Sequence, residues 1–230
     1  MTTLFQKTFC CLLLQLFFFI AGQAQEPSTP SGLQDSLLVL NNSILTKPSF
    51  DAYYNRGLIM FQLGDFTGAI RDFTSAAEID PTDKNVFFYR GKAKDHVGEN
   101  ESAVRDFSKA IELDSTVAEI YLNRGISKRV LADYGGAILD YNKALELHPD
   151  YVEAYNNRGL ARFYSGDDAG ALEDFNKSIS LNPDYADAYA NRGDWMYYDG
   201  KDADACTDWS KAAGLGNAKA KKSADKFCEH

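Results

Sequence analysis

The chain repeats itself every 34 residues. The tripeptide Asn-Arg-Gly, or a close variant, recurs with its glycine at Gly57, Gly91, Gly125, Gly159 and Gly193. A constant period of this length is typical of solenoids, in which each unit stacks only on its neighbours. With each glycine set as position 8, the five units are residues 50–83, 84–117, 118–151, 152–185 and 186–219.

Other positions recur in the same register and predict two helices in each unit. Position 4 is always aromatic and position 20 is always alanine. A second aromatic follows at position 24, as Phe73, Phe107, Tyr141, Phe175 and Trp209. Spacings of three and four place such residues on one helix face. Glycine stands where the first helix of four units should end, and proline closes three units, so each unit is predicted to be an antiparallel helix pair.

This pattern of aromatic, Gly, Ala, aromatic, Ala and Pro resembles the tetratricopeptide repeat over residues 50 to about 219. The resemblance implies an all-α fold, a right-handed α-solenoid of five 34-residue helix-turn-helix repeats. Residues 33–49 and 220–230 are expected to form the N- and C-terminal capping helices that cover the ends of the stack. The resemblance also implies a scaffold or adaptor for protein–protein interaction whose first helices line a concave surface.

The first residues are predicted to be an export signal. In residues 1–24, Lys7 precedes an apolar run from Phe9 to Ile20, and small residues follow. The run is shorter than the roughly 20 residues that span a bilayer, although a retained anchor is the alternative. Residues 25–32 then form a linker. We therefore expect a bacterial envelope protein, periplasmic or secreted, with membrane contact only through the transient signal peptide.

Charge and motifs narrow the function further. The chain has 33 acidic and 24 basic side chains, a formal charge of −9, which disfavours nucleic-acid binding. No zinc-protease, nucleophile-elbow or phosphate-loop motif occurs, and the histidines are scattered. We expect no enzyme activity, no metal and no cofactor.

Arginine at position 7 and aspartate at position 23 accompany each other in every unit. The pairs, each 16 residues apart, are Arg56 with Asp72, Arg90 with Asp106, Arg124 with Asp140, Arg158 with Asp174, and Arg192 with Asp208. A guanidinium pairs well with a carboxylate through two parallel hydrogen bonds. We interpret them as structural ion pairs, within a unit or between neighbours. An anion-binding arginine stripe is the alternative.

The concave face is where a peptide is expected to bind. Position 6 reads Asn55, Tyr89, Asn123, Asn157 and Asn191. An amide row can bond an extended backbone independently of its sequence, and some tetratricopeptide members hold peptides with such a ladder. Tyr89 interrupts the row, and a merely tolerated polar residue is the alternative. Large side chains around it suggest an apolar groove: Tyr54, Phe61, Phe88, Phe163, Tyr164 and Tyr198. They could instead pack between units or in a dimer.

The partner is expected to be a neutral or basic extended protein segment. Position 2 on the same face is mostly acidic, as Asp51, Asn85, Glu119, Glu153 and Asp187. An acidic tail is therefore a poor ligand. The second hypothesis is a structural, self-assembling envelope protein that buries this face in a homo-oligomer.

Two cysteines remain after the predicted signal. Cys206 and Cys228 are placed symmetrically about residue 217, where a turn is expected between antiparallel helices. Such helices would bring the two α-carbons near the roughly 7 Å limit for a disulfide. Export to an oxidising compartment favours the bond over two free thiols.

Overall fold

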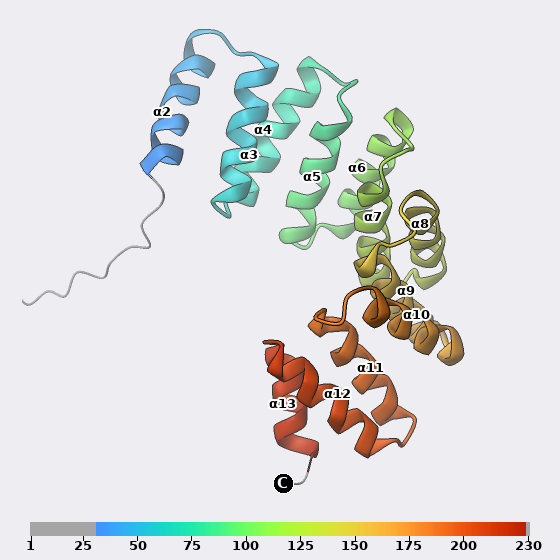
Figure 1. Ribbon diagram of the computed structural model, residues 1–230. Coiled ribbons are helices and arrows are strands. Elements are labelled where there is room, and N and C mark those ends of the chain that lie inside the picture. Colours follow the sequence, from blue (N-terminus) through green and yellow to red (C-terminus); the bar gives the residue numbers. More distant parts are fainter. Residues whose placement is uncertain (1–30, 229–230) are drawn as a thin grey trace, which may run out of the picture. The chain divides into compact units, whose positions relative to one another are not determined.

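The computed structural model describes residues 31–228, and this part of the chain is helical, without strands (Figure 1). The first helices of the five repeats are α3 (Phe50–Gln62), α5 (Lys84–His96), α7 (Ala118–Val130), α9 (Val152–Ser165) and α11 (Ala186–Tyr198). The second helices are α4 (Phe66–Ile79), α6 (Asn100–Leu113), α8 (Tyr134–Leu147), α10 (Asp168–Leu181) and α12 (Asp202–Gly214). Helix α2 (Ser31–Thr46) precedes the repeats and α13 (Ala218–Phe227) follows them.

The predicted all-α solenoid of helix-turn-helix pairs is confirmed. By its contacts the chain divides into two units, residues 1–39 and 40–230, and the repeats lie in the second. Within that unit each helix packs on the next one along the chain, from α3 to α13. The predicted signal peptide lies outside the described residues. Among the helices of residues 31–228, none is both long and apolar enough to cross a membrane.

The recurring glycine at position 8 lets the two helices of a repeat touch. A Cβ placed on Gly125 would lie 2.6 Å from the ring of Tyr141, and one on Gly57 would lie 2.8 Å from the ring of Phe73. Both rings are fully buried, so they cannot move aside. The aromatic of position 24 therefore packs directly on the backbone of the first helix.

The turn inside each repeat uses a left-handed residue, and in three repeats an aspartate side chain caps the second helix. In four repeats the left-handed residue is glycine, such as Gly166 with φ of 88°. In repeat 3 it is Ala132, with φ of 61°, which costs an L-residue about 1 kcal/mol. The N-cap aspartates Asp65, Asp133 and Asp167 then accept a backbone hydrogen bond from the second helix.

The first helices form the inner row of the stack. Consecutive first helices contact each other, as in α5 with α7 and α9 with α11, whereas no contact of similar extent joins consecutive second helices in the described part. The more closely spaced row lies on the concave side. We call the surface of α3, α5, α7, α9 and α11 that faces away from the second helices the inner face.

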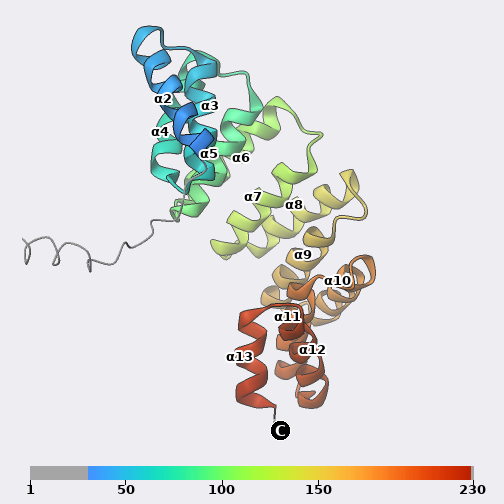
Figure 2. The ribbon, with the colours of Figure 1, turned by 60° about the vertical axis from the view of Figure 1, so that its left-hand side comes forward.

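The end helices differ slightly from the predicted bounds. Helix α2 begins at Ser31, so the last two residues of the predicted linker are helical. Helix α13 begins at Ala218 because Asn217 caps it by accepting a hydrogen bond from the backbone of Ala220. It packs against α12 in both views (Figures 1 and 2). Cys206 in α12 and Cys228 after α13 have their α-carbons 5.6 Å apart, with the sulfurs at bonding distance.

Candidate functional site

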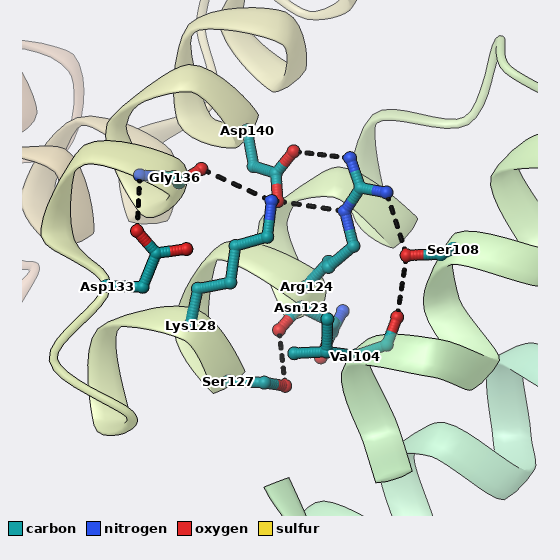
Figure 3. Close-up of polar contacts among 9 residues, drawn as sticks. All are labelled: Val104, Ser108, Asn123, Arg124, Ser127, Lys128, Asp133, Gly136 and Asp140. Atoms are coloured by element: carbon teal, nitrogen blue, oxygen red, sulfur yellow. Dashed lines mark hydrogen bonds and ion pairs between the residues drawn. The ribbon is translucent and has the colours of Figure 1, made fainter. Parts of the chain in front are cut away.

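The recurring arginines and aspartates meet inside each repeat. In repeat 3, Nη2 of Arg124 donates to Oδ1 of Asp140 at 2.6 Å and Nε donates to Oδ2 at 2.9 Å (Figure 3). Equivalent two-bond pairs join Arg56 to Asp72, Arg90 to Asp106, Arg158 to Asp174 and Arg192 to Asp208. All five aspartates are buried, so these groups hold the two helices of a repeat in register.

The third nitrogen of each arginine reaches back to the helix that precedes its repeat. Nη1 of Arg124 donates to Oγ of Ser108 in α6 at 3.0 Å (Figure 3). In the other repeats the acceptors are Asn41, Thr74, Asn142 and Asn176. Position 25, which supplies four of these acceptors, is always a short polar residue, a signal that the sequence analysis missed. The arginines are occupied within the stack and leave no anion-binding stripe.

The middle repeats add a second cation to the buried aspartate. Nζ of Lys128 lies 2.8 Å from Oδ2 of Asp140 (Figure 3). In the same way, Lys94 contacts Asp106 and Arg162 contacts Asp174. These cations occupy position 11, where repeats 1 and 5 have Met60 and Met196. The sequence alone shows this change from methionine to a cation at position 11, but it did not indicate that the cation would contact the aspartate.

The asparagines of position 6 lie on the inner face but do not form one connected row. Nδ2 of Asn123 and of Asn157 donates to the carbonyl four residues earlier in its own helix, at 2.7 and 2.8 Å. Nδ2 of Asn191 instead donates to Oδ1 of Asn156 in the preceding repeat at 2.9 Å. Asn55 is exposed. Among the described residues, none donates to Oδ1 of Asn123 or Asn157, so each keeps a free acceptor and a second N–H.

The predicted groove aromatics of repeats 1 and 2 pack against one another. Tyr89 lies at the centre, with ring centroids 6.2 Å from Tyr54, 6.3 Å from Phe61 and 5.3 Å from Phe88. Burial raises the pKa of Tyr54 to about 12. Phe88 is only 7% exposed and also packs on Phe107. Phe88 therefore packs inside the stack, in one buried cluster with Phe107 of its own repeat and Ile120 of the next, and is not exposed to a partner as expected.

The aromatics of repeats 4 and 5 surround a cavity of about 470 Å³ on the inner face. Phe163, Tyr164 and Tyr198 all line it, and Tyr164 and Tyr198 are 55% and 76% exposed. Two further rings, those of Tyr197 and Phe227, form part of the cavity wall, with their centroids 4.8 Å apart. The sequence did not indicate that α13 completes this wall.

Three charged side chains complete the cavity lining: Arg129, Asp194 and Lys219. Oδ1 of Asp194 accepts from Nε1 of Trp209 at 2.9 Å, and Oδ2 accepts from Nζ of Lys219 at 2.7 Å. That hydrogen bond raises the pKa of Lys219. Both oxygens of Asp194 are thus used, and Lys219 is held at the wall.

The carboxyl of Asp95, in the first helix of repeat 2, has a shifted pKa. Burial raises the pKa of Asp95 to about 6, against the opposing effect of a hydrogen bond from Ser127. The Ser127 hydroxyl of α7 lies 2.8 and 2.9 Å from the two oxygens of Asp95 in α5. In the described part of the chain, no group of three or more His, Cys, Asp or Glu residues is arranged to hold a metal ion.

Comparison with known proteins gives one consistent family. The model described as "TPR repeat" matches residues 133–166 and 159–200, and the model described as "Tetratricopeptide repeat" matches residues 50–83. No curated protein sequence matches the chain.

Three solved structures illustrate the fold similarity. A MamA protein is 28% identical, covers 75% of this chain and 94% of its own, and superposes with a TM-score of 0.64. YrrB, described as a TPR protein with an unusual peptide-binding site, is 20% identical, with coverages of 81% and 97% and a TM-score of 0.63. A tetratricopeptide repeat protein from Parabacteroides merdae ATCC 43184 is 20% identical, with coverages of 86% and 79% and a TM-score of 0.66.

Proposed function

This chain belongs to the tetratricopeptide repeat family, and from that premise we propose that it is a scaffold that binds an extended segment of a partner protein on its inner face. Proteins of this family are generally scaffolds and not enzymes, and we propose no catalytic role for this one. The observation that carries the proposal is the cavity of about 470 Å³ in the inner face of the last repeats, lined by exposed tyrosines.

The amides beside that cavity support an extended ligand. Asn123 and Asn157 occupy the same register in adjacent first helices, and each keeps a free carbonyl oxygen and a free N–H. A peptide backbone needs one donor and one acceptor at each contact, and these side chains offer both. The binding path then runs from repeat 3 to repeat 5 and ends at the cavity. Asn55 lies away from it, beside the packed aromatics of repeats 1 and 2.

The charges beside this path favour a segment that is neutral or basic as a whole. Glu119, Glu153 and Asp187 are exposed at position 2 of the three first helices concerned. A segment with many carboxylates would be repelled along this row.

Export and a disulfide complete the proposal. The residues 1–24 have the composition of a secretory signal. An oxidising compartment would then allow the Cys206–Cys228 pair, already at bonding distance, to form a covalent link between α12 and the capping helix α13.

The proposal is tested by selecting 12-residue peptides displayed on phage against the full-length chain. Binding of the selected peptides is then measured by calorimetry to the chain and to the triple variant Asn123→Ala, Asn157→Ala, Asn191→Ala. We expect the triple variant to lose at least tenfold in affinity. The variant Asn100→Ala, at the start of a second helix and away from the inner face, is the control and should bind like the unmodified chain.

Two outcomes would count against it. Unchanged peptide affinity in the triple variant would remove the asparagines from the site. A stable dimer in light scattering whose inner face is protected from hydrogen exchange would favour the self-assembling alternative.

A further inference from the structure

A second, smaller pocket lies beside the inner-face cavity, at the junction of repeats 4 and 5. We call it the aromatic pocket; its volume is about 200 Å³ and its lining is Phe163, Asp168, Trp195, Tyr198 and Asp199. Phe163 and Tyr198 also line the cavity of about 470 Å³, so the two spaces adjoin. A volume below the roughly 300–1,000 Å³ typical of small-molecule pockets has room for a single side chain.

The repeat register explains why there is space at this junction. At two other junctions the ring at position 17 of one repeat stacks on the ring at position 13 of the next: Phe66 on His96, and Tyr134 on Tyr164. Position 17 of repeat 4 is Asp168, so Tyr198 at position 13 of repeat 5 has no such ring to stack on. Tyr198 consequently stays 76% exposed, and the space beside it remains open.

The residues that line this space are aromatic and acidic. Position 10 is tryptophan only in repeat 5, as Trp195, and is alanine, serine or isoleucine in the other four repeats. Position 14 is Asp199 in repeat 5 and leucine, valine or serine elsewhere. Within residues 31–228, no other side chain forms a hydrogen bond or an ion pair with the exposed carboxylate of Asp168. The junction therefore combines ring surfaces with negative charge, a combination that attracts cations.

A lysine of the chain already makes contacts of the kind that a bound cation would make. Nζ of Lys201 lies 5.0 Å from the centroid of the Trp195 ring and 2.7 Å from Oδ2 of Asp199. The side chains of Lys201 and Asp199 are 48% and 47% exposed, and such exposed pairs are weak. A cation from a partner can therefore compete with Lys201, and the second carboxylate, Asp168, is available to it.

We propose that the aromatic pocket binds the guanidinium of an arginine in the partner segment, against the rings of Trp195 and Tyr198 and beside the carboxylates of Asp168 and Asp199. A planar guanidinium can stack on an aromatic ring and pair with a carboxylate at the same time, which an ammonium does less well. The inference rests on the proposed peptide-binding function and adds to it one residue type that the last two repeats select. An arginine also suits the acidic residues of position 2, which favour a neutral or basic segment.

The two tryptophans of the chain report separately on the two adjoining spaces. Trp195 lines the aromatic pocket, and Trp209 lines the larger cavity. Full-length chain labelled with 5-fluorotryptophan therefore gives two fluorine NMR signals, and the variant Trp195→Phe assigns them.

The test titrates three acetylated and amidated hexapeptides at low ionic strength: Gly-Ser-Leu-Arg-Ser-Gly and the two versions in which citrulline or lysine replaces the arginine. The arginine peptide should shift the signal of Trp195 and bind about tenfold more tightly than the uncharged citrulline peptide, with the lysine peptide between them. Equal binding of the arginine and citrulline peptides, or a shift confined to Trp209, would overturn the proposal.

Protein variants then locate the preference. Replacing Asp168 and Asp199 together by asparagine should reduce the arginine-to-citrulline preference from about tenfold to about twofold, because only the rings remain. Asp202→Asn is the matched control, since Asp202 is the exposed position-17 aspartate of the next repeat and does not line the pocket. It should keep the full preference.

Lys201→Gln should instead raise the affinity for the arginine peptide about threefold, because the ammonium no longer competes for Trp195 and Asp199. A loss of affinity in this variant would overturn the proposal. So would a full preference in the double aspartate variant with unchanged circular dichroism.

Two further results separate this inference from the proposed function. If the hexapeptides leave both tryptophan signals unchanged but phage-selected peptides bind and depend on the three asparagines, the scaffold function stands and the arginine pocket does not. If acetyl-arginine amide binds as tightly as the arginine hexapeptide, the pocket belongs to small guanidinium compounds and the peptide occupant is excluded.

Discussion

In repeats 1 and 2 the inner-face aromatics pack together around Tyr89, whereas in repeats 4 and 5 they surround an open cavity. The two regions share one helix architecture and one register. Repeats 1 and 2 place large rings at position 5, Tyr54 and Phe88, while repeats 4 and 5 have Asn156 and Ala190 there. Aromatic content alone therefore does not identify a binding surface; what matters is whether neighbouring positions fill the space between the helices.

The largest expected effect distinguishes a packed ring from an exposed one. Phe88→Ala should lower the free energy of unfolding by about 4 kcal/mol, because it removes a buried ring that packs on Phe107 of the same repeat and shares a buried cluster with Ile120 of repeat 3. Urea denaturation followed by circular dichroism measures this. A loss below about 1 kcal/mol would mean that the Phe88 ring is not part of the packed core.

The next effect concerns the wall of the cavity. Replacing Cys206 and Cys228 together by serine should cost about 3 kcal/mol, local to α12 and α13, since a loop of this length is no longer closed in the unfolded chain. Hydrogen exchange should then increase in α13 and remain unchanged in α3 and α5. A reducing agent should lower the melting temperature of the unmodified chain only; the same decrease in the double variant would show that no disulfide is involved.

A smaller effect is expected at Asp95, which joins α5 to α7 between the two regions. Its folded pKa of about 6 lies above the ordinary value of 3.8, so the folded state binds more protons in this interval and stability falls as pH rises through it. Asp95→Asn can still accept from Ser127 and should stabilise the protein by about 1 kcal/mol at pH 7.5, with the gain vanishing toward pH 4. Chemical denaturation at the two pH values is the measurement, and an equal gain at both would exclude the carboxyl as the cause.

The smallest expected change in stability is at the cavity rim. Tyr198→Ala should alter the free energy of unfolding by less than about 0.5 kcal/mol, because the side chain is 76% exposed. The same variant should weaken binding of the phage-selected peptides severalfold. Loss of stability without loss of binding would place Tyr198 with the packed aromatics and remove the contrast with Phe88.

The sequence by itself determined the repeat, the helix pairs and the partners of the recurring charges. Each depends on interactions repeated at a fixed separation, such as 16 residues between Arg124 and Asp140, so one period contains the whole pattern. The position of the turn was predicted as well, although only the structure shows that Ala132 adopts the left-handed conformation usually taken by glycine.

The tertiary structure alone decided which inner-face residues are available to a partner. Register places Tyr54 and Phe88 at position 5 and Phe163 and Tyr198 at positions 12 and 13, all on the inner face. It does not tell which of these rings are buried, because burial depends on side chains from several helices at once. The cavity joins residues of α7, α9, α11, α12 and α13, and no single period contains such a set.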